Sequence, residues 1–545
     1  MSSNHTDITR PPDLRQKSGT GPIRLRQPVY RDTIPPCNHA CPAGENIQAW
    51  LSLAQEQRFE EAWRTLVQDN PLPGVHGRVC YHPCESSCNR AQVDDAVSIH
   101  AVERFLGDMA VERGWKPVLE AESSGKRVLV VGAGPSGLSA AWHLALMGHE
   151  VEIFEAGPLA GGMLRLGIPA YRLPRDILDA EIKTIEDIGV TIRLDHKVDS
   201  VPEAKENGNF DAVFMAIGAH LAKKVDIPAR DAGKILDAVS YLASVEAGDT
   251  PKLGRRVAIY GGGNTAMDAA RTAKRMGAEE AMIIYRRDRK HMPAHDFEAQ
   301  EAEEEGIEIN WLRTIRQIDS TDFQVEVMKV DENGRPQPTG EFETLEADSL
   351  VLALGQNVDS SILETIPGVK LGWDGVVAVG PNMMTGANGI FAGGDMVPSE
   401  RTVTIATGHG KKAARHIDAW LRGQQYVKER TRPSVDYSAL HLWYHTDAQQ
   451  QQQSELPAEQ RNADFREITL GLSEEEAIFE SSRCYSCGNC FECDGCFGAC
   501  PENAIIKLGK GLRYEIDYAR CTGCEACFLQ CPSHAMEMVD VGSVT

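Results

Sequence analysis

The sequence predicts an α/β protein with two doubly wound, Rossmann-like domains, preceded by a helical domain and followed by a C-terminal α+β module. Three observations support this prediction. Apolar strand-like runs alternate with helical patterns over residues 126–425. Glycine-rich strand–turn–helix units occur twice in that region. All 15 cysteines lie outside it, five between Cys37 and Cys88 and ten between Cys484 and Cys531.

These patterns divide the chain into seven expected segments. A glutamine-rich stretch, DAQQQQQSELPAEQRN, is typical of a linker. The expected segments are a flexible arm (1–30), a helical cysteine domain (31–120), the first nucleotide-binding domain (121–245), the second (246–360), the return of the first (361–425), a linker (426–480) and a cysteine-rich module (481–545).

Bulk composition restricts the class of protein. The net charge of -23 argues against nucleic acid and anionic membranes as partners. The sequence contains no run of about 18 apolar residues, so it predicts no membrane span. The polar N-terminus lacks the apolar core of a signal peptide. We therefore expect a cytoplasmic protein, in which clustered cysteines indicate metal or redox sites rather than disulfides.

The first unit is KRVLVVGAGPSGLSAAWHLALMGHEVEIFE. Its glycines allow a tight turn and close approach of a pyrophosphate, which the following helix N-terminus would face. Glu155, at the end of the second strand, could accept hydrogen bonds from ribose hydroxyls, so this site suits FAD. The alternative is a glycine-rich loop without a ligand. The candidate residues here are Gly132, Gly134, Pro135, Ser136, Gly137 and Glu155.

The second unit, RRVAIYGGGNTAMDAARTAKRMGAEEAMIIYRRDR, has Gly261 and Gly263 in the same context. Its second strand ends in Arg286 and Arg287. Arginine at this position suits a 2′-phosphate, whereas an acid would repel it. The site therefore suits NADP(H), with NAD(H) as an alternative. A solvated basic pair is the competing interpretation of the two arginines.

A third run, GIFAGGDMVPSERTVTIATGHG, predicts the return of the first domain. Asp395, after Gly394 in a Gly-Gly-Asp turn, could bind the ribityl chain. The helix starting near Thr404 could point its positive end at the flavin ring.

The C-terminal module holds Cys-x2-Cys-x2-Cys-x3-Cys-Pro twice and resembles the bacterial two-cluster ferredoxin. In that module the fourth cysteine of each run ligates the other cluster. Zinc is the alternative metal. The resemblance implies one [4Fe–4S] cluster on Cys490, Cys493, Cys496 and Cys531, and another on Cys521, Cys524, Cys527 and Cys500.

Residues 31–425 resemble the small subunit of bacterial glutamate synthase, the N-terminal half of dihydropyrimidine dehydrogenase and the large subunit of NADH-dependent ferredoxin:NADP oxidoreductase. The matching runs are PCNHACP, NPLPGVHGRVC, VGAGPSGLSAA, GGNTAMDAAR, YRRD, MPA, ALGQ and FAGGD. The resemblance implies that FAD accepts hydride from NAD(P)H and that [4Fe–4S] clusters carry single electrons away. It implies FAD contacts by Gly132, Gly134, Gly137, Glu155, Gly162, Met163, Arg172 and Asp395, and nucleotide contacts by Gly263, Asn264, Thr265, Arg286, Arg287 and Gly355.

Hydride transfer to a flavin requires no acid or nucleophile from the protein, so we expect no catalytic side chain. The path would run from NAD(P)H through FAD and the clusters to an outside acceptor, or in reverse. No substrate domain is recognised. We therefore expect a hetero-oligomer or dimer, with ferredoxin or a larger catalytic oxidoreductase subunit as partner. The alternatives are a true glutamate synthase small subunit, a flavin-bifurcating subunit, and an electron-wiring scaffold with an idle nicotinamide site.

The N-terminal cysteines depart from those relatives, which carry an extra Arg-Cys-x-x-Cys-Gly before the first motif. One cluster is still implied by Cys41, Cys80 and Cys84, with Glu103 where the dehydrogenase has a glutamine ligand. The segment RCYSCG at Cys484 and Cys487 resembles the missing piece.

Four clusters need sixteen ligands, and fifteen cysteines plus Glu103 make sixteen. We hypothesise that Cys37, Cys88, Cys484 and Cys487 hold one cluster, within one chain or with a dimer mate. The alternative is three clusters and four spare thiols.

Overall fold

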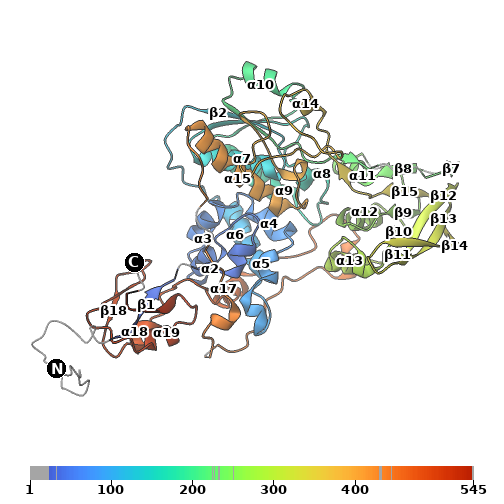
Figure 1. Ribbon diagram of the computed structural model, residues 1–545. Coiled ribbons are helices and arrows are strands. Elements are labelled where there is room, and N and C mark those ends of the chain that lie inside the picture. The colour runs from blue at the N-terminus through green and yellow to red at the C-terminus, as the bar shows by residue number, and fades with distance from the viewer. Residues whose placement is uncertain are drawn as a thin grey trace, which may run out of the picture.

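The computed structural model describes residues 24–31, 33–223, 225, 227–230, 234–249, 251–428, 432–443 and 445–542. Figure 1 shows a small N-terminal helical domain at the centre. One α/β domain lies above it, the second lies to its right, and the cysteine-rich module lies to its lower left. No helix among these residues is both long enough and apolar enough to cross a membrane.

The helical domain consists of α1 (Pro36–Ala40), α2 (Ile47–Gln55), α3 (Phe59–Val67), α4 (Pro73–Val79), α5 (Pro83–Ser86) and α6 (Ile99–Arg113). Helices α4 and α6 pack almost backbone to backbone. A Cβ atom added at Gly77 would lie 2.5 Å from the Arg104 backbone, and one at Gly107 would lie 2.4 Å from the Gly74 nitrogen. These glycines bring Cys80, at the end of α4, close to the buried Glu103 of α6.

The first α/β domain has a parallel sheet in the order β17-β5-β2-β3-β4. The strands are β2 (Arg127–Val131), β3 (Glu150–Phe154), β4 (Thr191–Arg193), β5 (Ala212–Met215) and β17 (Ile390–Ala392), with α7 (Pro135–Leu146), α9 (Arg175–Asp187) and α15 (Val403–Leu421) packed around them. Because β17 pairs with β5 only after the second domain has been traversed, the second domain is an insertion.

The second domain has a parallel sheet in the order β11-β10-β9-β15-β8. The elements of this layer are β8 (Lys234–Asp237), α11 (Ala238–Glu246), β9 (Arg256–Tyr260), α12 (Asn264–Arg275), β10 (Glu280–Tyr285), α13 (Asp296–Glu304), β11 (Glu308–Trp311) and β15 (Ser349–Leu352). An antiparallel layer adds β12 (Arg313–Asp319), β13 (Asp322–Val330) and β14 (Pro336–Glu346), with β7 (Ala229–Arg230) at its edge. The short strands β6 (Leu221–Ala222) and β16 (Gln356–Asn357) pair antiparallel where the chain enters and leaves this domain.

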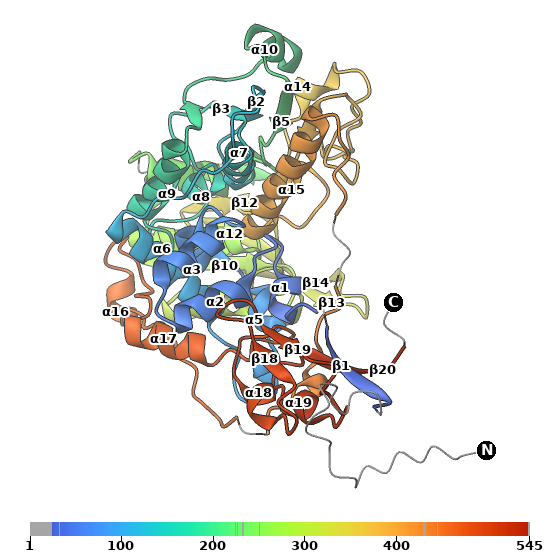
Figure 2. The ribbon, with the colours of Figure 1, turned by 90° about the vertical axis from the view of Figure 1, so that its left-hand side faces the viewer.

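The C-terminal module has α18 (Gly495–Ala499), β18 (Ile505–Lys507), β19 (Tyr514–Ile516), α19 (Ala526–Leu529) and β20 (Met536–Asp540). Figure 2 shows β1 (Arg26–Tyr30) beside β20, with which it pairs antiparallel. The end of the expected arm is therefore a strand of this module, and residues 1–23 lie outside the described residues.

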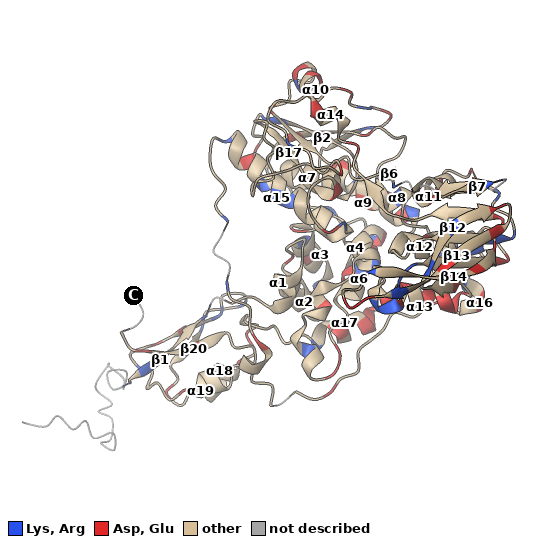
Figure 3. Cartoon of the chain, turned by 45° about the vertical axis from the view of Figure 1, so that its right-hand side comes forward, with Lys and Arg blue, Asp and Glu red and all other residues tan. Residues whose placement is uncertain are grey.

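The segment expected as a linker is packed along the other domains, and we call residues 445–473 the strap. Gln453 accepts a hydrogen bond from Arg104, and Glu467 pairs with Arg78, both in the helical domain. Arg461 of α16 (Ala458–Arg461) pairs with Glu304 of the second nucleotide domain. The strap then enters α17 (Glu474–Ser482), whose acidic first turn is visible in Figure 3. The amide-rich composition resembles a linker because it is polar, but the side chains we name here have partners in the folded chain.

Candidate functional site

A cavity of about 940 Å³ lies between the helical domain and the two α/β domains. This volume suits a large organic cofactor. The predicted residues that line it are Gly132, Gly134, Pro135, Ser136, Glu155, Gly162, Met163, Arg172, Asn264, Thr265, Gly394 and Asp395. The predicted residues that do not line it are Gly137, Gly261, Gly263, Arg286, Arg287, Gly355 and Thr404.

The first glycine-rich turn is held in the shape that a pyrophosphate needs. A Cβ atom at Gly137 would lie 2.0 Å from the Gly132 carbonyl oxygen, so only glycine allows this close approach. The Glu155 carboxylate accepts N–H hydrogen bonds from Ala133 (2.8 Å) and Gly157 (2.9 Å). The turn and the acid therefore meet at one wall of the cavity, as the sequence predicts for a dinucleotide site.

Helix α15 connects this cavity to the first cysteine group. Its N-cap Thr402 accepts the Ile405 N–H, and Thr402, Val403 and Ala406 line the cavity. The N-terminus of this 19-residue helix therefore provides a positive field there. Thr404 itself is not among the residues that line the cavity. Its hydroxyl donates to the Cys80 sulfur at 3.0 Å.

Asp395, in the Gly-Gly-Asp turn after β17, also lines the cavity. Burial raises the pKa of its carboxyl above the usual value. Arg401, which also lines the cavity, partly offsets this rise. A partly buried carboxyl at the cavity wall suits a ligand that offers hydroxyl donors, such as a ribityl chain.

Arg172 lines the cavity, but its guanidinium also joins the two α/β domains. It pairs with Asp268 at 3.0 Å and with Glu298 at 2.6 Å, and both partners belong to the second domain. The predicted FAD contact is therefore also a buried interdomain ion pair.

The second glycine-rich turn lies at the carboxyl edge of its sheet. Tyr260 pairs in register with Ile284 and Leu352, so the residues after β9, β10 and β15 lie side by side. These residues include Gly261, Arg286, Arg287 and Gly355, at the edge where nucleotides bind in doubly wound folds. Arg286 is exposed, and Arg287 lies over the Tyr285 ring at 5.9 Å.

Cys41, Cys80, Cys84 and Glu103 form the first group of candidate metal ligands. Burial raises the pKa of the Cys80 thiol to about 12, and the nearby Glu103 adds to the rise. Burial also raises the pKa of the Cys41 and Cys84 thiols far above normal, and the nearby Cys80 adds to the rise in both. Asn70 donates to a Glu103 carboxylate oxygen at 2.8 Å and so orients the carboxyl.

The second group joins distant parts of the sequence. Cys37, Cys88, Cys484 and Cys487 line one small cavity within a single chain. Burial raises the pKa of Cys484 to about 11 and of Cys487 to about 12, with neighbouring thiols as a further cause. Burial and the other three thiols together raise the pKa of Cys37 well above normal. The geometry thus requires no dimer mate.

The C-terminal module contains two further groups, and each includes one cysteine from the other run. Burial raises the pKa of Cys496 to about 12, with Cys490, Cys493 and Cys531 next among the causes. Burial also raises the pKa of Cys527 to about 12, and the neighbouring Cys521, Cys524 and Cys500 add to this rise. Cys531 and Cys500 therefore lie beside the opposite runs, as in the ferredoxin resemblance.

The sulfur atoms in these groups are suited to hold metal. Buried thiols resist ionisation unless a cation compensates the charge, and bound iron would supply it. Backbone N–H groups donate to sulfur from His82 to Cys80 (3.3 Å), Ser486 to Cys484 (3.4 Å), Ala504 to Cys500 (3.2 Å) and Ala535 to Cys531 (3.3 Å). Such hydrogen bonds stabilise cluster thiolates and tune cluster potentials.

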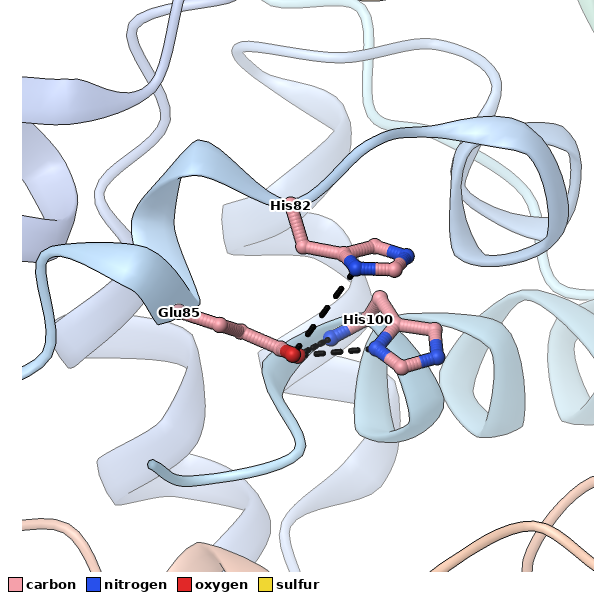
Figure 4. A group of neighbouring side chains, drawn as sticks. All are labelled: His82, Glu85 and His100. Atoms are coloured by element: carbon pink, nitrogen blue, oxygen red, sulfur yellow. Dashed lines mark hydrogen bonds and ion pairs between the residues drawn. The ribbon is translucent and has the colours of Figure 1, made fainter. Parts of the chain in front are cut away.

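Three side chains, His82, Glu85 and His100, lie together next to the loop that carries Cys80 and Cys84 (Figure 4). The His82 and His100 rings stack at 3.8 Å, and Glu85 accepts from His100 Nδ1 at 2.8 Å. Arg104 donates to Gln453 Oε1, so Gln453 Nε2 is the donor to His100 Nε2. His100 Nδ1 then carries the proton given to Glu85. The group therefore orders the cysteine loop rather than offering free metal ligands.

Several residues at these sites carried no signal in the sequence. Tyr81 lines the large cavity from the helical domain. From the second nucleotide domain, His295 and the predicted residue Asn264 contact Tyr81. Tyr81 lies between two cysteines, a position that marks no aromatic residue as functional. Asp268 lies within the GGNTAMDAAR run, but nothing in that run identifies its partner.

Comparison with known protein families gives three matches. Residues 126–410 match the family described as pyridine nucleotide-disulphide oxidoreductase. Residues 32–115 match the 4Fe–4S cluster domain II of dihydropyrimidine dehydrogenase, and residues 514–537 match a 4Fe–4S binding domain.

Three curated relatives resemble most of the chain. The beta subunit of an NADP(+)-dependent formate dehydrogenase from Moorella thermoacetica is 37% identical, covering 83% of this chain and 70% of the relative. The beta subunit of an NADPH-Fe(3+) oxidoreductase from Geobacter sulfurreducens is 34% identical, covering 83% and 75%. The small chain of an NADPH glutamate synthase from Azospirillum brasilense is 34% identical, covering 72% and 87%.

Proposed function

The chain belongs to the pyridine nucleotide-disulphide oxidoreductase family, and from this premise we propose that it is the nicotinamide-facing subunit of a larger oxidoreductase. In this role it exchanges hydride between NADPH and FAD and moves single electrons along [4Fe–4S] clusters. The observation that carries the proposal is the contact from the Thr404 hydroxyl to the Cys80 sulfur. It joins the helix at the cofactor cavity to the first cysteine group.

The residues around the large cavity fit FAD. The Gly132–Gly137 turn would hold the pyrophosphate, Glu155 the ribose hydroxyls, and Asp395 the ribityl chain. The α15 N-terminus would favour negative charge on the ring system. When bound, FAD supplies the exchange between two-electron hydride transfer and one-electron steps.

We assign the NADP site to the carboxyl edge of the second sheet. The α12 N-terminus after Gly263 would face the phosphates, and Arg286 and Arg287 would meet the 2′-phosphate. Asn264 and Thr265 line the large cavity, so they would lie where nucleotide and FAD meet.

We further propose four [4Fe–4S] clusters. The supporting observation is the grouping of ligands into four sets of four. The proposed sets are Cys41, Cys80, Cys84 and Glu103; Cys37, Cys88, Cys484 and Cys487; Cys490, Cys493, Cys496 and Cys531; and Cys500, Cys521, Cys524 and Cys527.

The proposed partner is a larger catalytic subunit that supplies the substrate site. The three relatives above are named as subunits or chains of larger enzymes, which supports this proposal. A free ferredoxin as acceptor and a cytoplasmic location are further parts of the proposal.

Anaerobically reconstituted protein tests the proposal through dye reduction and metal content. NADPH should bleach the flavin and reduce a viologen dye, and iron analysis should give about sixteen irons per chain. The double substitution Cys484→Ser/Cys487→Ser should lower this to about twelve and leave NADPH bleaching of the flavin intact. About twelve irons in the wild type would contradict the four-cluster assignment. Failure of NADPH to bleach the flavin would contradict the proposed hydride exchange.

A further inference from the structure

The loop between α4 and α5 carries Tyr81 from the helical domain to the second nucleotide domain. Tyr81 follows Cys80 directly, and it lines both the large cavity and a second cavity of about 370 Å³. Its ring stacks on the His295 ring, with centroids 3.8 Å apart and planes 21° apart. The centroid of the Phe297 ring lies 6.5 Å from that of Tyr81. The helical domain therefore contacts the nucleotide domain through an aromatic stack.

The Tyr81 hydroxyl reaches the second glycine-rich turn. The Asn264 side-chain N–H donates to this hydroxyl oxygen, and the Asn264 carbonyl oxygen accepts the His295 backbone N–H at 3.1 Å. Both ends of the Asn264 amide are therefore fixed. Ala294 N–H donates to the Gly262 carbonyl at 3.1 Å, so the His295 segment is tied to the same turn.

The Tyr81 hydroxyl retains one unused hydrogen. Asn264 is the donor in their contact, and no acceptor for the Tyr81 hydrogen is present in the part of the chain that the structure describes. Tyr81 shares the cavity wall with Asn264 and Thr265, the first residues of α12. The complementary ligand group is an oxygen acceptor of a nucleotide seated at that helix start.

We propose that Tyr81 is a positioning residue of the nicotinamide-nucleotide site, supplied by the iron–sulfur domain across the domain boundary. Its hydroxyl donates to an oxygen of the bound nucleotide, and its contact with Asn264 fixes the turn beneath. The inference rests on the proposed function, because it assumes that NADP(H) binds at the second turn. Tyr81 lies outside the second glycine-rich unit, so it extends the site beyond the second domain.

The test compares NADP+ binding to the reconstituted holoprotein and to Tyr81→Phe, which keeps the ring stack and removes only the hydroxyl. The expected result is a dissociation constant about 2- to 10-fold higher, as for loss of one hydrogen bond. Flavin bleaching should slow at limiting NADPH more than at saturating NADPH. Iron content and dithionite reduction of the flavin should not change. The control is Tyr426→Phe, whose ring contacts His416 away from the cavity.

A second variant keeps the inference testable if Tyr81→Phe fails to fold. His295→Ala keeps the sequence of the Cys80 loop and removes the ring stack that holds Tyr81 in place, so it should also raise the dissociation constant for NADP+. If Tyr81→Phe binds NADP+ as tightly as the wild type does, this inference is overturned and the proposed function is not. If Tyr81→Phe loses iron, wild-type affinity in His295→Ala would overturn it instead. A wild type that neither binds NADP+ nor is bleached by NADPH would overturn the proposed function, and this inference with it.

Discussion

Replacing Arg172 by methionine should loosen the second nucleotide domain. Arg172 is the cation between Asp268 and Glu298, whose side chains are only 6% and 1% exposed. Removing one partner of a buried ion pair typically costs about 3–5 kcal/mol, because it leaves an uncompensated charge. Methionine is a similarly long and flexible side chain that carries no charge.

The expected cost is smaller than that range because one partner can become neutral. Burial raises the pKa of Glu298 to about 7, so near neutral pH this carboxyl is already partly protonated. Most of the penalty then falls on Asp268, and we expect about 2–3 kcal/mol.

Amide hydrogen exchange across α12 measures this loss as a local opening free energy. A loss of about 2–3 kcal/mol corresponds to exchange roughly 30- to 150-fold faster. The double variant Arg172→Met/Asp268→Asn should recover much of the protection, because it removes the stranded charge. Exchange within about threefold of wild type in Arg172→Met would refute the argument that this ion pair holds the domains together.

Two further predictions concern the helical domain. Thr404→Val removes the hydrogen bond to Cys80. It should lower the midpoint potential of the first cluster, measured in an EPR titration, by about 20–60 mV, the equivalent of one hydrogen bond. The control is Thr65→Val, which removes a hydroxyl that donates to the Glu61 carbonyl within α3. An unchanged potential would show that the hydroxyl does not tune this cluster. Glu181 accepts N–H bonds from Gly74 and Val75 at the start of α4, and burial raises its pKa to about 8. The folded state thus holds the proton more tightly than the unfolded state. This stabilisation is complete below the usual pKa of 4.5 and is lost as pH rises to about 8. Thermal scans from acid to alkaline pH should show wild type losing stability relative to Glu181→Gln, and parallel profiles would contradict the prediction.

Local motifs made much of the fold and cavity predictable. Gly132, Gly134 and Glu155 act within one strand–turn–helix unit, so their spacing reflects their geometry. The grouping of Cys37 and Cys88 with Cys484 and Cys487 was predicted by counting ligands, and the structure brings these four together.

Features that depend on how domains meet were not predictable. The helix that starts near Thr404 was expected to point at the flavin ring, but nothing in the sequence indicated that the Thr404 hydroxyl would contact Cys80. The partners of Arg172 and the role of Tyr81 depend on where an inserted domain docks, and no local pattern encodes that. The glutamine-rich strap resembled a linker because composition does not reveal whether amides find partners.

The pairing of β1 with β20 has a consequence for synthesis. Arg26 lies opposite Asp540, so about five hundred residues leave the ribosome between the two strands of this ladder. Until then the edge of β1 is open to any other strand. The cysteines at 484 and beyond also appear late. The nascent chain can therefore assemble its first proposed metal site early, whereas the other three proposed sites must wait until residues 484–531 have emerged.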